Sequence, residues 1–218
     1  MTVRSTAVAV LLVAGSAAAQ APYELQRGQR FLAATFGGSF PTGAGPRFGV
    51  VRNRAVVMGS AQAEWVLAAG RYAALSGLVE IPVALVLPSA DAPGHECWWR
   101  LTTRLRLCSL VDRPHDAVMA LGVSPLGLKV SASPASQARF FAALSGGGMY
   151  FDRNTPVVAA RALNFSSELS VGIDVSSRDG SRVASLGWKY QHWSNAGTAP
   201  VNPGLDANLI VVAVRSRR

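Results

Sequence analysis

The stretch that decides the fold is Ala162-Leu-Asn-Phe-Ser-Ser-Glu-Leu-Ser-Val-Gly-Ile-Asp-Val175. Its odd positions are apolar apart from Ser167, whereas its even positions are small or polar and include Glu168 and Asp174. Because side chains alternate between the two faces of a strand, the pattern predicts a strand with one apolar and one polar face. The stretch exceeds the usual strand length of about 5–6 residues and could cross a bilayer as a tilted strand.

Seven other segments alternate in the same way, most clearly Ala55–Leu67 and Leu75–Leu87. The eight predicted strands lie at about 29–40, 54–68, 73–88, 117–130, 138–151, 161–176, 181–194 and 206–216. Connections after the second, fourth and sixth strands are short, and those after the third, fifth and seventh are longer. This organisation is typical of outer-membrane barrels. Pro82 and the weak alternation within 117–130 fit it least well.

Composition supports an all-β chain but does not decide alone between a membrane barrel and a soluble sandwich. Of 218 residues, 21 are glycine and 12 are proline, which disfavours a helical bundle, and no long uncharged apolar run follows the N-terminus. A sandwich buries its apolar face, whereas a barrel turns that face outward and keeps polar groups in the lumen. Strand length, the exported leader and recurring mid-strand charges favour a narrow, filled barrel spanning residues 20–218; these charges are Glu64, Glu80, Glu168, Asp174 and Lys189. A soluble exported sandwich is the more distant alternative.

The N-terminus predicts a cleaved signal peptide over residues 1–19. Arg4 precedes an apolar segment, Ala7–Val13, and the small residues Gly15–Ala19 suit signal peptidase, with Ala21 as the alternative cleavage position. Removal of this leader takes one base and no acid, so the mature net charge is 20 − 12 = +8. We therefore expect export to the outer membrane; a short N-terminal tether is the alternative. Outer-membrane barrels usually end in an aromatic residue, whereas this chain ends in Arg218.

The long loops carry few indications of a partner. Segments 89–116 and 152–161 hold six arginines against five acids, so the basic excess is not concentrated there, and nothing indicates nucleic-acid binding. Export permits a loop-closing disulfide between Cys97 and Cys108, although two reduced thiols remain an alternative. His95 and His115 lack metal-ligand spacing, so we expect no metal and read them as solvated loop residues.

Residues with catalytic potential gather around the seventh predicted strand. By alternation His192 and Ser194 share its apolar, outward face, and a serine beside an imidazole is the beginning of a nucleophile–base pair. Asp206 opens the antiparallel eighth strand, where its carboxylate could orient the imidazole. Oxyanion donors could come from backbone N–H groups at Asn195–Gly197 and from the Asn202 side chain. The alternative is an interfacial histidine and serine followed by an ordinary turn.

Two motifs here, His192-Trp-Ser-Asn-Ala196 and Asn202-Pro-Gly-Leu-Asp206, resemble the signature of the lipid A 3-O-deacylase family, the PagL-type outer-membrane barrels. Three upstream pieces resemble the broader group of acyloxyacyl hydrolase relatives, so that the resemblance covers roughly residues 117–216; these pieces are Gly122–Gly127, Gly146–Phe151 and Asn164-Phe165 ahead of Glu168.

The resemblance implies an eight-stranded antiparallel transmembrane barrel that hydrolyses the 3-O-linked hydroxyacyl ester of lipid A, within lipopolysaccharide of the outer leaflet, without a cofactor. It assigns the nucleophile to Ser194, the base to His192 and the acid to Asp206, where the family pattern has the longer Glu. It places the oxyanion hole at Asn195, Gly197 and Asn202. A non-catalytic barrel for lipid binding or envelope integrity is the alternative function, and neither the oligomeric state nor the acyl chain removed can be read from the sequence.

Overall fold

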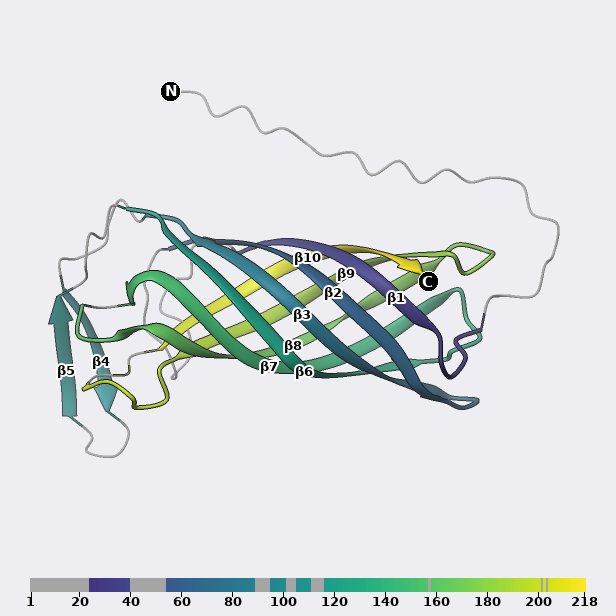
Figure 1. Cartoon of the computed structure of the whole chain (residues 1–218), viewed down its shortest axis with the longest axis horizontal. Helices are drawn as coiled ribbons and strands as arrows, with labels where there is room; N and C mark the ends of the chain where they lie inside the picture. Colours follow the sequence, from purple (N-terminus) through teal and green to yellow (C-terminus); the bar gives the residue numbers. More distant parts are fainter. Residues whose placement is uncertain are drawn as a thin grey trace, which may run out of the picture.

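A computed structural model describes residues 24–39, 54–88, 116–156, 158–200, 202 and 204–218, together with the backbone of 95–100 and 105–110. Eight strands close into an antiparallel barrel in the order β1-β10-β9-β8-β7-β6-β3-β2 (Figure 1). The strands are β1 (Arg30–Ser39), β2 (Val56–Ala69), β3 (Ala73–Val86), β6 (Val118–Ala132), β7 (Ala138–Thr155), β8 (Arg161–Ser176), β9 (Arg182–Ser194) and β10 (Leu205–Arg217). The predicted eight-stranded all-β barrel is confirmed, and the predicted signal peptide lies outside the described residues. None of the described ranges contains a helix long and apolar enough to span a membrane.

The two ends of the barrel differ, as the sequence predicts. Turns 70–72, 133–137 and 177–181 lie at one end together with the C-terminus, whereas β1, β3, β7 and β9 run to their last residues at the other end (Figure 1). One connection is shorter than expected, because β7 continues through Thr155 and pairs it with Arg161 of β8 across an irregularity. That extension is polar, so alternation of apolar residues does not reveal it.

The predicted loop 89–116 contains a separate two-stranded hairpin at the long-loop end. Its strands are β4 (His95–Arg100) and β5 (Leu105–Leu110), and their register sets Cys97 directly opposite Cys108. Cross-strand partners are the positions from which a disulfide could form, but the side chains there lie outside the described residues. The disulfide therefore stays a prediction, and His115 also lies outside the described residues.

Side chains alternate between a lipid-exposed wall and a filled lumen. On β8, for example, Leu163 and Phe165 are exposed on the wall, whereas Asn164 and Ser166 are buried in the lumen. The five charges predicted to face the lumen are all buried, which confirms that prediction; they are Glu64, Glu80, Glu168, Asp174 and Lys189.

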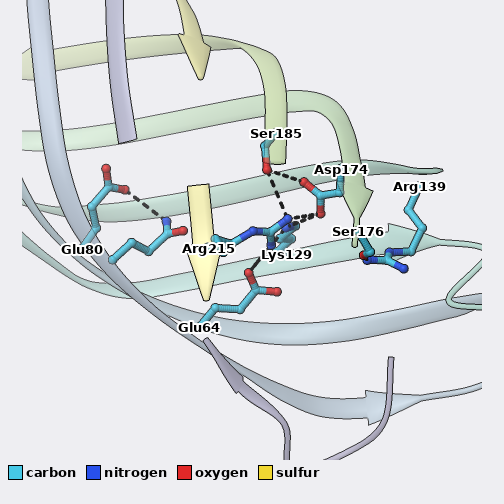
Figure 2. Close-up of polar contacts among 9 residues, drawn as sticks. Glu64, Glu80, Lys129, Arg139, Asp174, Ser176, Ser185 and Arg215 are labelled. Atoms are coloured by element: carbon cyan, nitrogen blue, oxygen red, sulfur yellow. Dashed lines mark hydrogen bonds and ion pairs between the residues drawn. The ribbon is translucent and has the colours of Figure 1, made fainter. Parts of the chain in front are cut away.

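Two ion clusters fill the middle of the lumen. In one, Asp174 binds Lys129 at 2.7 Å and Arg215 at 2.5 Å, and both bases also contact Glu64 (Figure 2). In the other, the Lys189 ammonium lies 2.7 Å from Glu168 and 3.1 Å from Glu80. Buried charges persist only when opposite charges and hydrogen bonds replace lost water, and these clusters meet that condition.

Apolar side chains cover the clusters on both sides. Toward the long-loop end, twelve residues form one buried cluster that includes Met149, Phe151, Trp193 and Leu209. The rings of Phe151 and Trp193 meet edge to face with centroids 5.8 Å apart. A smaller cluster, with Phe31 at its centre, packs toward the short-turn end. In the part of the barrel that the structure describes, side chains thus fill most of the lumen and leave a cavity of about 70 Å³ beside the ion clusters.

Two prolines account for the irregular positions in β6 and β3. In β6 the exposed positions are odd up to Val123 and even from Leu126, and the register with β7 shifts between these two residues. A bulge at Ser124-Pro125 thus reverses the facing of the rest of the strand, because one extra residue changes the parity. In β3, Pro82 falls between the paired positions Glu80 and Val83 of the β3–β6 ladder, where no donor is required.

Candidate active site

The candidate site lies on the outer wall at the long-loop end of β9 and β10. These strands pair so that His192 stands opposite Asp206. Between the outward residues of β9, Gln191 and Trp193 point into the lumen and are buried. The indole of Trp193 therefore packs in the lumen behind the part of β9 that carries His192.

The structure brings His192 and Asp206 into direct contact. His192 Nδ1 lies 2.6 Å from Asp206 Oδ1, and the side chains are 23% and 5% exposed. The shorter aspartate thus reaches the imidazole directly, because the two residues are cross-strand partners. With Nδ1 held by the carboxylate, Nε2 is the nitrogen left for proton transfer.

Two serines flank the imidazole on the same face. Ser194 follows two positions later on β9, a spacing of about 6.6–6.8 Å along a strand, and its β8 partner is Phe165. Ser167 of β8 stands directly opposite His192 and is exposed. Within the described part of the chain, neither hydroxyl is hydrogen-bonded to the imidazole. Catalytic hydrogen bonds often shorten only when substrate binds, so the geometry allows either hydroxyl to be the nucleophile.

The loop after Ser194 is built by its own polar groups. Ala196 and Gly197 have φ values of 50° and 78°, and the Thr198 N–H donates to the Asn195 carbonyl at 3.0 Å. Positive φ at both central positions defines a type I′ turn. The Asn195 side chain reinforces it by accepting the Gly197 N–H at 3.0 Å.

The predicted oxyanion-hole residues are gathered in this loop, but two of their N–H groups already have partners. The Asn195 N–H donates to Asn202 Oδ1 at 2.9 Å, and the Gly197 N–H donates to the Asn195 side chain. The first contact fixes the Asn202 amide so that its oxygen faces Asn195 and its NH₂ group is directed elsewhere. Of the described residues in this loop, Ala196 keeps its N–H without an acceptor.

Aromatic and apolar residues surround the site on the membrane-facing wall. Tyr190, two positions before His192, stacks on Trp188, and its hydroxyl lies beside the Asp206 carboxylate. Asp206 Oδ2 is buried and has no hydrogen-bond partner among the described residues. Phe165 on one side and Ile210 on the other are exposed to lipid. An ester with long acyl chains could therefore lie against the wall with its carbonyl near His192.

Sequence reasoning missed Ser167 and Tyr190. The tight turn at Ser177–Gly180 sets the β8–β9 register, and counting back from it pairs residue 167 with residue 192. That count was available from the sequence. Alternation along β9 puts Tyr190 on the same face as His192, but its proximity to Asp206 depends on side-chain direction, which alternation does not give.

Together, the fold and these residues define a membrane-barrel protein with a histidine–carboxylate pair and two neighbouring serines on its outer wall. The family model for lipid A 3-O-deacylase (PagL) matches residues 94–215, more than half of the chain. The chain belongs to this family of outer-membrane enzymes.

The fold agrees with that of a solved outer-membrane enzyme. The crystal structure of the outer membrane enzyme PagL superimposes with a TM-score of 0.52 at 12% identity, covering 85% of this chain and 98% of that one. Neisserial surface protein A gives a TM-score of 0.47 at 7% identity, covering 86% and 95% of the two chains. A search of curated proteins found no match.

Proposed function

We propose that this chain removes the 3-O-linked hydroxyacyl chain from lipid A, with Ser194 as nucleophile, His192 as general base and Asp206 as the carboxylate that orients the base. The observation that supports it best is the 2.6 Å contact between His192 Nδ1 and Asp206 Oδ1 on the lipid-facing wall. Placing an ionisable pair on a lipid-facing wall costs free energy, so a pair retained there indicates a functional site. Membership of the deacylase family supplies the substrate.

In the proposed reaction, Ser194 Oγ attacks the ester carbonyl while its proton passes to His192 Nε2. The tetrahedral intermediate collapses, the carbonyl carbon–oxygen bond to the sugar breaks, and the imidazolium returns the proton to the departing lipid A hydroxyl. Water, deprotonated by the same imidazole, then attacks the acyl-serine; the acyl carbon–Oγ bond breaks, the imidazolium returns its proton to Ser194 Oγ, and a 3-hydroxy fatty acid is released. Asp206 stabilises the imidazolium at both stages.

Donors for the oxyanion are proposed from the loop 195–202. The Asn195 and Gly197 N–H groups hold the turn together, so we assign the oxyanion to the Asn202 NH₂ group and the Ala196 N–H. This assignment keeps Asn195, Gly197 and Asn202 in the site, with the first two as positioning residues.

The deciding experiment compares lipid A mass spectra from cells producing wild type, Ser194→Ala or Ser167→Ala, each shown by heat-modifiable mobility to be folded in the outer membrane. We expect Ser194→Ala to abolish release of the 3-hydroxy fatty acid and Ser167→Ala to preserve it. Ser167→Ala is the matched control, because it removes an equally outward hydroxyl beside the same imidazole. The reverse result would move the nucleophile to Ser167, and activity in both variants would exclude a serine mechanism at this site.

A further inference from the structure

A basic rim surrounds the short-turn end of the barrel. Among the described residues that are exposed at that end there are seven arginines against two carboxylates, a net charge of 7 − 2 = +5. The arginines, all exposed, are Arg27, Arg30, Arg71, Arg178, Arg182, Arg217 and Arg218, and the carboxylates are Glu24 and Asp179. The lumen charges pair among themselves, so they do not offset this rim.

Three of these arginines lie near one another on the outer wall: Arg182 on β9, Arg30 on β1 and Arg218 directly after β10. Arg182 of β9 is the cross-strand partner of Ser216 on β10, and Arg218 follows two positions later. The Arg218 N–H donates to the Arg30 carbonyl of β1 at 2.9 Å. Arg182, Arg218 and Arg30 thus form a continuous basic arc across β9, β10 and β1, at the end where the short turns and the C-terminus lie (Figure 1).

A hollow of about 540 Å³ adjoins this arc, and its lining is basic and apolar apart from Glu64, whose carboxylate pairs with Lys129 and Arg215 in the lumen. Arg30 and Arg218 line it together with Leu32 and Trp65. Trp65 is the cross-strand partner of Arg30, and its indole lies against Gly77, where a side chain would clash with it. Basic groups at the border of an apolar wall, beside an interfacial tryptophan, match an anionic head group joined to acyl chains.

At the opposite rim, the described side chains of Arg54, Arg153 and Arg161 are matched by Asp116, Asp152 and Asp206, and Arg153 pairs with Asp116 and Asp152 at 3.3 Å each. The sequence adds six further arginines and three acids to the connections there, so the net charge by itself does not distinguish the two ends. The arc is distinguished by its place, because the short turns mark the periplasmic side in barrels of this organisation.

We propose that the arginine arc of Arg30, Arg182 and Arg218 is a binding site for an anionic phospholipid of the inner leaflet, with the phosphate held by guanidinium groups and an acyl chain in the hollow beside Trp65. Guanidinium groups suit phosphate because they donate paired hydrogen bonds in a fixed plane. The site lies at the other end of β9 and β10 from His192, and it does not depend on the proposed deacylase activity.

The test is a native mass spectrometry titration of the delipidated full chain in detergent, with palmitoyl-oleoyl phosphatidylglycerol and, for comparison, phosphatidylcholine carrying the same chains. We expect wild type to retain phosphatidylglycerol in preference to phosphatidylcholine. In Arg30→Gln/Arg182→Gln/Arg218→Gln its affinity should fall about 100-fold, because each arginine near an anionic surface contributes a factor of about five. The variant with lysine at the three positions should keep most of the affinity.

Three controls make the result specific. Arg153→Gln/Arg161→Gln, which removes arginines from the opposite rim, and Ser194→Ala should both bind the lipid as wild type does. Excess inorganic phosphate should not displace it; displacement would instead indicate a free-anion site. Equal binding of the two lipids by wild type, or unchanged binding by the glutamine variant, would overturn the proposal. If the glutamine variant does not fold, as judged by heat-modifiable mobility, single Arg30→Gln decides by the same criterion.

Discussion

Asp174 and Asp206 are both buried aspartates that pair with a base, but they face opposite sides of the barrel wall. In the lumen, Asp174 uses both oxygens: Oδ1 accepts the Ser185 hydroxyl at 2.7 Å, and Oδ2 binds Lys129 and Arg215 (Figure 2). On the wall, Asp206 binds His192 through Oδ1 and has the Tyr190 hydroxyl beside its carboxylate, whereas its buried Oδ2 accepts no hydrogen bond among the described residues.

The difference separates a structural carboxylate from a reactive one. A charge whose hydrogen-bonding capacity is filled by fixed partners stabilises one arrangement and changes little during a reaction. A carboxylate bound to a neutral imidazole on one side can gain interaction energy when that imidazole becomes charged, which favours a charged transition state. We therefore expect replacement of Asp206 to reduce activity and replacement of Asp174 to reduce stability.

The largest expected effect is on catalysis, from Asp206→Ala. Deacylation should fall about 10⁴-fold, the cost of losing the tautomer and charge support of a serine-hydrolase histidine, while stability changes little because the site lies at the end of the wall. The effect is measured as the rate at which the purified protein releases 3-hydroxy fatty acid from lipid A. Asn208→Ala, the next outward position of β10, is the matched control and should keep activity. A fall of less than tenfold for Asp206→Ala would remove Asp206 from the mechanism.

The second effect is on stability, from Asp174→Ala. Removing this carboxylate leaves Lys129 and Arg215 with only Glu64 in the buried cluster, and breaking a buried pair costs about 3–5 kcal/mol. We expect a lower urea midpoint for the heat-modifiable form, with unchanged deacylation per folded molecule. Ser170→Ala, also on β8 and facing the lumen, should unfold as wild type does. Wild-type stability in Asp174→Ala would show that the lumen charges are dispensable.

These two positions also show how far the sequence leads. Alternation along β8 places Asp174 in the lumen and alternation along β9 places His192 on the wall, and both placements are correct. The partners of Asp174 were harder to predict. One of them, Lys129, lies on β6, and the side chains of β6 change faces at the Ser124-Pro125 bulge. Asp206 was predictable, since antiparallel pairing across the last connection aligns it with His192.

What could not be predicted are features set by hydrogen bonds within loops. The turn after Ser194 engages the Asn195 and Gly197 N–H groups, which spacing alone suggested as oxyanion donors. The β4–β5 hairpin was likewise hidden, because its short strands lack a long alternating pattern. Local polar contacts compete with the patterns from which strands are predicted.

A third, smaller effect concerns the loop that holds the wall site. Gly197 has φ of 78°, and an added methyl group would meet no atom within 4 Å, so Gly197→Ala tests backbone conformation alone. We expect it to destabilise the turn by about 1–2 kcal/mol and to reduce deacylation while the urea midpoint of the barrel stays constant. Gly70→Ala, in a periplasmic turn where the new methyl would have an ordinary 3.7 Å contact, is the control. Equal activity in the two variants would show that the turn geometry does not matter for the wall site.

The smallest effect comes from a fully exposed carboxylate, which supplies a reference for the two buried ones. In the turn 177–181, the Ser177 hydroxyl donates to Asp179 Oδ1 at 2.6 Å and the Ser181 N–H at 3.1 Å, and these bonds lower the pKa of Asp179 from its usual value. Because the folded-state pKa lies below the unfolded one, the stabilisation is present above the unfolded pKa of about 3.9 and is lost as pH falls through the folded value. The difference in thermal midpoint between wild type and Asp179→Asn should therefore be constant from pH 7 to pH 5 and shrink in stronger acid. Arg71→Gln, in another short turn, should show no such pH dependence, and a wild-type-to-Asp179→Asn difference that grows with acidity would contradict the assigned hydrogen bonds.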